Sequence, residues 1–242
     1  MNALVVGGSS GIGLSIVLQL VQDAKMEHVF VVDKSMFSKA YENDKIVWRH
    51  CDLSLGDYSL FDHFSDIQAL YITAGFGHLK WFQDISREDI DTCFSVNAIA
   101  PIQIIRHYYD KLLSGDSFNC AVLVSISGRL SSPLFSIYSS TKAALSKFIE
   151  AVNVELDVQG SANRILEVSP GSVKGTSFDG GVSQPELTTW LAKEIIDRSR
   201  RQERLFIPQY EEVFKNVIER YQSDPHQFGI ESYWYKKKQG RF

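Results

Sequence analysis

Short apolar runs alternate along the chain with longer segments in which apolar residues recur at helical spacing. The runs are rich in Val, Ile and Leu, which is typical of strands covered on both faces. They lie at residues 3–6, 29–32, 46–48, 70–73, 121–125 and 165–168, with 205–208 as a candidate edge strand. Helices are predicted over residues 11–25, 58–64, 90–113, 137–158, 185–201 and 211–221. This alternation predicts an α/β fold, a doubly wound parallel sheet with helices on both faces.

No linker, internal repeat or low-complexity stretch divides the sequence, so we expect a single domain over residues 1–242. Residues 209–242 are expected to form a C-terminal helix and an irregular tail, which could serve as an inter-subunit arm. The tail's aromatic residues should dock on the parent domain or on a neighbouring subunit. They are Phe228, Tyr233, Trp234, Tyr235 and Phe242. The lysine run 236–238 is interpreted as a solvated segment, with weak contact to an anionic surface as the alternative.

The composition of the chain limits the classes of binding partner that we expect. With 44% hydrophobic residues the chain can bury a sizeable core. The formal net charge of −4 gives no basic excess for nucleic acid. No apolar run approaches the ~20 residues of a membrane span, and no basic leader precedes the first apolar stretch. The three cysteines form neither a metal-binding pair nor a disulfide framework. We therefore expect a cytoplasmic protein with no metal, membrane or nucleic-acid partner.

A glycine-rich loop follows the first predicted strand and opens the first predicted helix. It comprises Gly7, Gly8, Ser9, Ser10, Gly11, Ile12 and Gly13. Glycines allow a tight turn and a close approach of the backbone to a pyrophosphate, and a helix N-terminus offers N–H groups and partial positive charge. The spacing differs from GxGxxG, and such a loop can also be an ordinary strand–helix turn. The context favours a dinucleotide site.

Asp33, at the end of the second strand, strengthens that interpretation. A carboxylate there can accept hydrogen bonds from ribose hydroxyls and would repel a 2′-phosphate. Ser10 supplies no positive charge inside the loop, and Lys34 is the one nearby cation that could hold such a phosphate. NAD is therefore favoured over NADP as the cofactor. A strand-end turn is the alternative role for Asp33.

Two further pairs of residues follow strand ends. Asp52 and Leu53 come after the third strand, where Asp52 could meet an adenine amino group or simply cap the next helix. Ala74 and Gly75 end the fourth strand, where small residues let the chain pass close to a ribose. Both pairs are candidate cofactor contacts.

Four polar residues are the catalytic candidates: Asn97, Ser125, Tyr138 and Lys142. Tyr138 and Lys142 are one helical turn apart, so an ammonium should lie beside the phenol and lower its pKa toward neutrality. Ser125, at the end of the fifth strand, could bind the substrate oxygen. Asn is a poor mid-helix residue, so Asn97 predicts a local kink, whose water could relay protons to Lys142.

Together these motifs resemble the short-chain dehydrogenase/reductase family, from residue 3 to about residue 178. The resemblance implies a Rossmann fold of about seven strands in the order 3-2-1-4-5-6-7. It also implies that Tyr138 and Lys142 touch the cofactor. Further cofactor contacts are implied at Pro170, Gly171, Val173 and Thr176, with one extra residue before Thr176. The chain departs from the family at Val6, where the family usually has threonine. It also departs at Thr73, where the family has asparagine, so the hydrogen bonds with which that asparagine braces the sheet must be made differently.

The predicted function is an NAD(P)-dependent oxidoreductase that moves hydride between nicotinamide and a ketone or secondary alcohol, with Tyr138 as general acid or base. The alternative is a catalytically silent dinucleotide sensor or scaffold of the same fold. The family also implies a homodimer or homotetramer. Its substrate-pocket segments give a mainly apolar set here: Leu130, Pro133, Leu134, Phe135 and Phe178.

Overall fold

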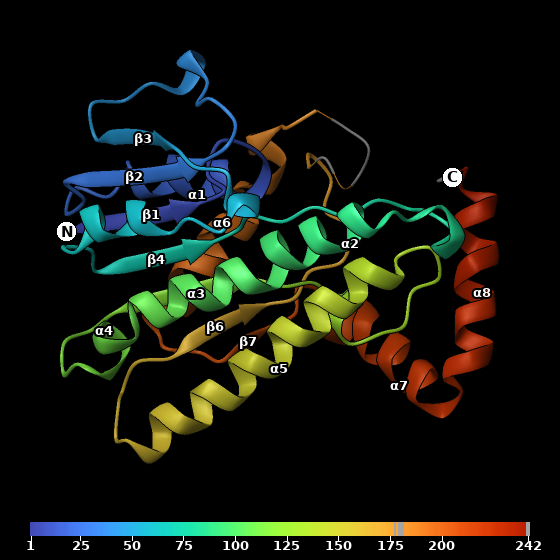
Figure 1. The fold of residues 1–242 in the computed structure, drawn as a ribbon. Helices are drawn as coiled ribbons and strands as arrows, with labels where there is room; N and C mark the ends of the chain where they lie inside the picture. The colour runs from blue at the N-terminus through green and yellow to red at the C-terminus, as the bar shows by residue number, and fades with distance from the viewer. Residues whose placement is uncertain (177, 179–181, 241–242) are drawn as a thin grey trace.

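The central feature of the molecule is one parallel sheet. The computed structural model describes residues 1–176, 178 and 182–240, and within them seven strands pair in the order β3-β2-β1-β4-β5-β6-β7 (Figure 1). They are β1 (Asn2–Val6), β2 (His28–Asp33), β3 (Ile46–His50), β4 (Ala69–Ile72), β5 (Asn119–Leu123), β6 (Ile165–Val168) and β7 (Leu205–Phe206). The predicted doubly wound sheet and its strand order are confirmed.

Helices cover both faces of this sheet (Figure 1). One face carries α1 (Gly11–Leu20) and α6 (Pro185–Arg200). The other carries α3 (Ala100–His107), α4 (Tyr109–Leu113) and α5 (Ser136–Val158), continued by α2 (Arg87–Phe94). Successive side chains of a strand point to opposite faces, so in β1 the pair Ala3 and Val5 joins one core, while Leu4 and Val6 join the other. The sheet therefore separates two hydrophobic cores.

The helices differ from the sequence prediction in three places. Residues 90–113 do not form one helix, because a π-helical turn, Ser95–Ile99, separates α2 from α3 and the cap at Tyr108 separates α3 from α4. The local irregularity expected at Asn97 therefore takes the form of a π-helical turn. Residues 58–64 form a 3-10 helix, Ser59–Phe64. Helix α1 stops at Leu20, since hydrogen-bonded turns occupy the following residues up to Met26.

The C-terminal segment departs most from expectation. A π-helical turn, Tyr210–Phe214, leads into α7 (Lys215–Ser223), and the tail predicted to be irregular forms α8 (Pro225–Lys238). Asp224 caps α8 by accepting a hydrogen bond from the Gln227 N–H, and Pro225 suits the first helical turn. The sequence therefore carried a capping signal that the weak apolar periodicity concealed. Phe242 lies outside the described residues.

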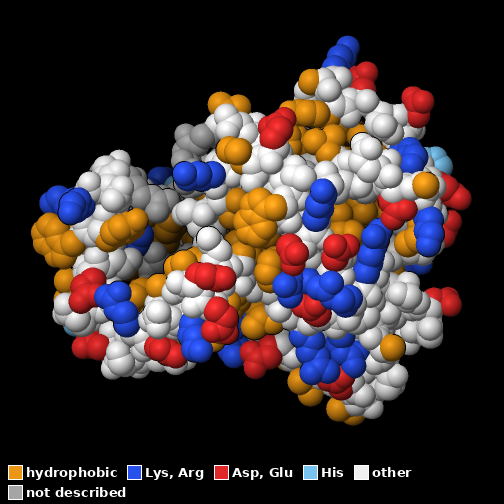
Figure 2. All heavy atoms as spheres, turned by 180° about the vertical axis from the view of Figure 1, so that it is seen from behind, with side chains coloured by type: hydrophobic (Ala, Val, Ile, Leu, Met, Phe, Trp, Pro, Cys, Tyr) orange, Lys and Arg blue, Asp and Glu red, His pale blue; other side chains and the backbone are white. Residues whose placement is uncertain are grey.

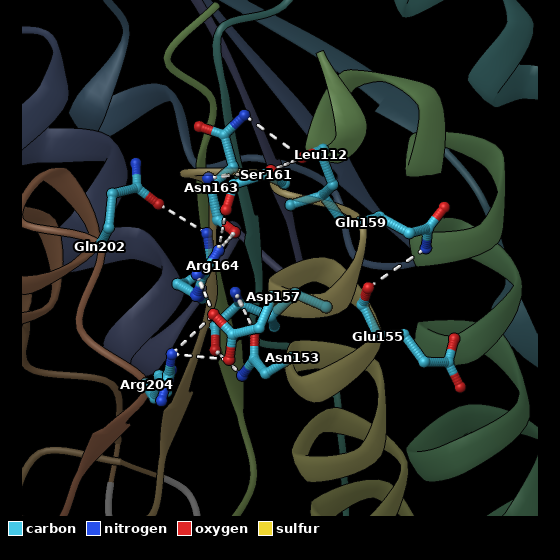
Figure 3. A network of polar contacts seen from close by, with 11 residues as sticks. Leu112, Asn153, Glu155, Asp157, Gln159, Ser161, Asn163, Arg164, Gln202 and Arg204 are labelled. Atoms are coloured by element: carbon cyan, nitrogen blue, oxygen red, sulfur yellow. Dashed lines mark hydrogen bonds and ion pairs between the residues drawn. The ribbon is translucent and has the colours of Figure 1, made fainter. Parts of the chain in front are cut away.

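A polar network fixes the amino ends of β6 and β7, opposite the carboxyl edge of the sheet (Figure 3). Asn153 of α5 exchanges two hydrogen bonds of 2.9 Å with the backbone of Ile165, at the start of β6. Asp157 binds Arg164 and, at 2.7 Å, Arg204, which precedes β7. The network joins the last turns of α5 to both strands, so α5 is held at a fixed position on the sheet.

The face seen in Figure 2 carries acidic and basic side chains intermixed, rather than one field of a single sign. None of the helices in the described ranges combines the length and the apolar character that a membrane span requires. Within the same ranges, no three His, Cys, Asp or Glu side chains gather as metal ligands would.

Candidate active site

A cavity of about 350 Å³ opens at the carboxyl ends of the strands. Residues that follow β1, β2, β3, β4, β5 and β6 all line it, which is where ligands bind in open α/β sheets. The predicted site residues at its wall are Gly7, Ser10, Gly11, Ile12, Gly13, Asp33, Asp52, Leu53, Ala74, Gly75, Ser125, Tyr138, Lys142, Pro170, Gly171, Val173 and Thr176. The fold therefore brings together residues from most of the chain, whereas Ser9 and Asn97 do not line the cavity.

The glycine loop is packed too closely for side chains at two positions. Gly7 has a φ of +86°, and a Cβ there would lie 2.5 Å from the Ala74 nitrogen. A Cβ on Gly13 would lie 2.1 Å from the Gly7 carbonyl oxygen. Substituents at these positions would push the loop away from the sheet and into the cavity. The glycines thus hold the start of α1 against the carboxyl end of β4.

The N-terminus of α1 faces the cavity through Gly11, Ile12 and Gly13, whose N–H groups belong to the first helical turn. The N-cap residue Ser10 makes no side-chain capping bond, and the Gly11 N–H donates to the Ser183 hydroxyl at 2.7 Å. A phosphate oxygen carries negative charge and is therefore a stronger acceptor for such a donor than a hydroxyl oxygen. This turn fits an anionic phosphate, with the helix dipole adding partial positive charge.

Asp33 is fixed at the opposite end of the loop. Its carboxylate accepts hydrogen bonds from the Ser9 N–H at 3.0 Å and the Ser35 N–H at 2.9 Å, while the Ser9 hydroxyl donates to the Ser35 carbonyl at 3.0 Å. Ser9 therefore helps to position Asp33 without lining the cavity itself. Lys34 also lines the cavity, so both residues expected to influence the binding of a 2′-phosphate are at its wall.

Asp52 takes the capping role, and its contact with an adenine amino group stays a prediction. Its carboxylate caps the short 3-10 helix Leu53–Leu55 by accepting bonds from the hydroxyl and N–H of Ser54, at 2.7 and 2.9 Å. These bonds hold the pKa of Asp52 below its usual value, so the group is a carboxylate at neutral pH. Asp52 also lines the cavity beside Leu53.

Thr73 replaces the bracing bonds that the family's asparagine would make. Its hydroxyl lies 3.0 Å from both the Val6 and Gly7 carbonyl oxygens. The side chain therefore ties the end of β4 to the beginning of the glycine loop. The departure from the family pattern at this position is compensated within the chain.

Ser125, Tyr138 and Lys142 converge at one end of the cavity. Tyr138 and Lys142 come from the start of α5, with the Lys142 nitrogen 5.9 Å from the tyrosine ring centroid, and Ser125 follows β5. The Ser125 hydroxyl accepts from the Ser127 N–H at 3.1 Å, and its hydrogen bond with Tyr138 lowers the pKa of the phenol. The Lys142 ammonium donates to the Leu123 carbonyl at 3.0 Å.

The pKa of Tyr138 moves in the direction opposite to the sequence prediction. Burial raises it to about 12, outweighing the opposing hydrogen bond from Ser125. Burial also lowers the pKa of Lys142 to about 8, because the charged ammonium loses its hydration. The expectation that Lys142 brings the phenol toward neutrality is therefore wrong for the protein without ligand. Sequence spacing placed the two groups together, but it carried no information on their desolvation.

Asn97 is fully buried in the π-helical turn. Its amide donates to the Phe76 carbonyl at 2.7 Å and accepts from the Phe76 N–H at 3.0 Å. A Cβ on Gly75 would lie 3.2 Å from the Asn97 oxygen and 3.1 Å from the Lys142 nitrogen. Asn97 therefore braces the segment after β4 against Lys142, and its water-relay role stays a prediction.

The segment after β6 closes the remaining side. Pro170 and Gly171 follow the strand, and a Cβ on Gly171 would lie 2.4 Å from the Phe214 ring. The Thr176 hydroxyl donates to the Val173 carbonyl at 2.7 Å, so the extra residue between them is absorbed in a local turn. All four predicted positions remain at the cavity wall.

The part of the cavity beside Tyr138 differs from the apolar pocket that was expected. Phe135 and Phe178 line the cavity, each with its ring centroid 5.2 Å from that of Tyr138. Leu134 lines a smaller neighbouring pocket instead, and Leu130 and Pro133 line neither. Ser132 and Lys236 lie at the wall. Lys236 was expected to be solvated, but it is only 6% exposed. No local sequence signal could reveal this burial, because it arises where α8 packs against the distant loop before α5.

A doubly wound sheet of this strand order, with a glycine loop at its carboxyl edge, defines a Rossmann-fold protein. A model of the short chain dehydrogenase family matches residues 1–186, and the chain belongs to that family. Two relatives from Saccharomyces cerevisiae are named as uncharacterized oxidoreductases, TDA5 and YDL114W. They are 28% and 24% identical over 73% and 81% of this chain. The chain spans only 56% and 66% of their lengths.

Solved structures agree on the fold. A short chain dehydrogenase/reductase from Burkholderia phymatum in complex with NAD has a TM-score of 0.77 at 16% identity, covering 92% of this chain and 93% of that one. An alcohol dehydrogenase from Thermococcus sibiricus complexed with 5-hydroxy-NADP has a TM-score of 0.69 at 19% identity, covering 85% and 94%. At these identities the similarity establishes the architecture, and the ligands belong to those proteins.

Proposed function

We propose that the protein is an NAD(P)-dependent oxidoreductase acting on a ketone or secondary alcohol, with NAD preferred. The observation that carries the proposal is the convergence of Ser125, Tyr138 and Lys142 on a cavity whose other end is the glycine loop. The first turn of α1 would hold the pyrophosphate, Asp33 the adenosine ribose, and Lys142 the nicotinamide ribose. When bound, the nicotinamide supplies the hydride donor or acceptor that no side chain can provide.

Tyr138 would act as the acid in the reducing direction. With its pKa raised to about 12, the group is a phenol at neutral pH and has a proton to give. Ser125 would hold the substrate oxygen, and the proton of Tyr138 would pass to that oxygen as the carbonyl carbon accepts hydride. Tyr138 and Ser125 line the same cavity, so the phenol would lie within reach of the oxygen that Ser125 holds.

The test replaces Tyr138 by phenylalanine, which removes the phenol oxygen and keeps the ring. We expect kcat to fall at least ~10²-fold, the low end for general acid–base catalysis, while the Kd for NADH measured by calorimetry is largely kept. Turnover is measured from cofactor absorbance across a panel of ketones and alcohols. A nearly normal rate in Tyr138→Phe would refute the assignment. Binding of NADH with no turnover of any panel member would favour the silent sensor instead.

A further inference from the structure

The wall beside Tyr138 contains a buried cation from the far end of the chain. Lys236 of α8 donates to the Ser132 hydroxyl oxygen at 2.7 Å, to the Pro133 carbonyl at 2.9 Å and to the Ser232 hydroxyl at 3.1 Å. Two of these bonds reach the loop that leads into α5. Helix α8 is thereby fastened to the substrate end of the cavity, where Ser132 and Lys236 both contribute to the lining.

The loop that carries Ser132 is held in one conformation. Leu134 has a φ of +70°, a left-handed backbone that a leucine adopts only when its surroundings impose it. The Leu134 carbonyl accepts from the Lys80 N–H at 3.0 Å, and the Phe135 N–H donates to the Ser132 carbonyl at 2.9 Å. Ser132 therefore stands at a fixed position, three residues before a ring that flanks Tyr138.

The Ser132 hydroxyl is prepared to act as a donor. Its oxygen accepts the bond from Lys236, and among the described residues its own proton has no acceptor. A hydroxyl whose oxygen is bonded to an ammonium donates more strongly, and such a donor prefers an acceptor with negative charge. The described carboxylates of the cavity wall, Asp33 and Asp52, follow β2 and β3, which β1 and β4 separate from β5 and the loop of Ser132. An anion beside Ser132 would therefore not meet them.

From this geometry we infer that Ser132, positioned and polarised by Lys236, binds a second oxygen of the substrate. The substrate is then an oxo acid or the corresponding hydroxy acid, whose carboxylate lies against Ser132 while its apolar part packs against the rings of Phe135 and Phe178 that flank Tyr138. The inference rests on the proposed function, because it assigns the substrate class of the same site. Ser132 is the specificity-determining residue, and Lys236 is its positioning residue.

The experiment compares phenylglyoxylate with propiophenone, two aryl ketones of which only the first carries a carboxylate. The wild-type protein with NADH should reduce the acid with a kcat/KM at least about 10-fold higher, as expected for a charge-assisted hydrogen bond. Ser132→Ala and Lys236→Met should each remove most of this preference, and Lys236→Arg should restore part of it. The Kd for NADH should be unchanged. In the NAD-loaded protein, phenylglyoxylate should bind more weakly to Ser132→Ala by a similar factor.

Matched controls are available on both elements. Ser131→Ala changes the neighbouring hydroxyl, which contacts Tyr221 and does not line the cavity, and Lys238→Met changes an exposed lysine of the same helix. Neither variant should alter the ratio of kcat/KM for phenylglyoxylate to kcat/KM for propiophenone. Reduction of propiophenone without preference for the acid, or a ratio unmoved in Ser132→Ala, would overturn the inference and leave the proposed function standing. If neither ketone is reduced while another member of the panel is turned over, the inference is overturned; if the cofactor-loaded protein turns over no member of the panel, the proposed function itself is overturned.

Discussion

Replacing Lys142 by methionine should stabilise the ligand-free protein at pH 7. The ammonium is buried, and its pKa falls from 10.5 to about 8 because burial penalises the charged form. At roughly 1.4 kcal/mol per pKa unit, holding the charge costs the fold about 3 kcal/mol. The variant also leaves the Leu123 carbonyl without its donor, which lowers the stability of the variant by about 1 kcal/mol. We therefore expect a net gain of about 2 kcal/mol in the free energy of unfolding.

The stability difference between the wild-type protein and the variant should depend on pH in one direction, which the lowered pKa of Lys142 determines. Below pH 8 the lysine is protonated in both the folded and unfolded states, so the wild-type protein bears the whole penalty. Between pH 8 and 10.5 the folded state loses its proton first, and the wild-type protein becomes more stable relative to the variant. The advantage of Lys142→Met should therefore disappear by pH 10. A group retained at this cost is typical of functional sites, where stability is traded for activity.

Urea unfolding of the wild-type protein and the variant, at pH 7 and at pH 10, measures this difference. Lys193→Met, an exposed lysine on α6, is the matched control and should change stability by less than about 0.5 kcal/mol. Lower stability of Lys142→Met at pH 7, or an advantage of equal size at both pH values, would refute the reasoning.

Three further predictions concern the cofactor end. Asp33→Ala should weaken NADH binding more than NADPH binding in calorimetric titrations, because the lost carboxylate would hold ribose hydroxyls and repel a 2′-phosphate; equal losses would contradict that contact. Gly13→Ala should weaken NADH binding at least about 10-fold and destabilise the fold, since its Cβ would lie 2.1 Å from the Gly7 oxygen, whereas Gly115→Ala, with nothing within 4 Å, should do neither. Thr73→Val should lower the free energy of unfolding by about 1 kcal/mol in urea denaturation, because the one hydroxyl proton shared between the Val6 and Gly7 carbonyls is lost; an unchanged midpoint would show that the hydroxyl does not brace the loop.

The sequence by itself determined the layered architecture and the position of the cavity. Alternating short apolar runs and amphipathic helices are properties of neighbouring residues, so they could be recognised without tertiary information. The glycine loop was equally local, because Gly7 and Gly13 lie on one strand–helix turn. The spacing of Tyr138 and Lys142 placed both side chains on one helical face, and the loop and these two residues line the same cavity.

Only the tertiary structure decided the electrostatics of the site and the composition of the cavity wall beside Tyr138. The pKa of Tyr138 is raised rather than lowered, because the desolvation of a group depends on every element packed around it. Lys236 belonged to a run of three lysines that looked solvated, and it became part of the wall only because α8 packs against the loop before α5. Periodicity is set by residues adjacent in the chain, whereas burial and contacts between distant segments exist only once the elements have docked.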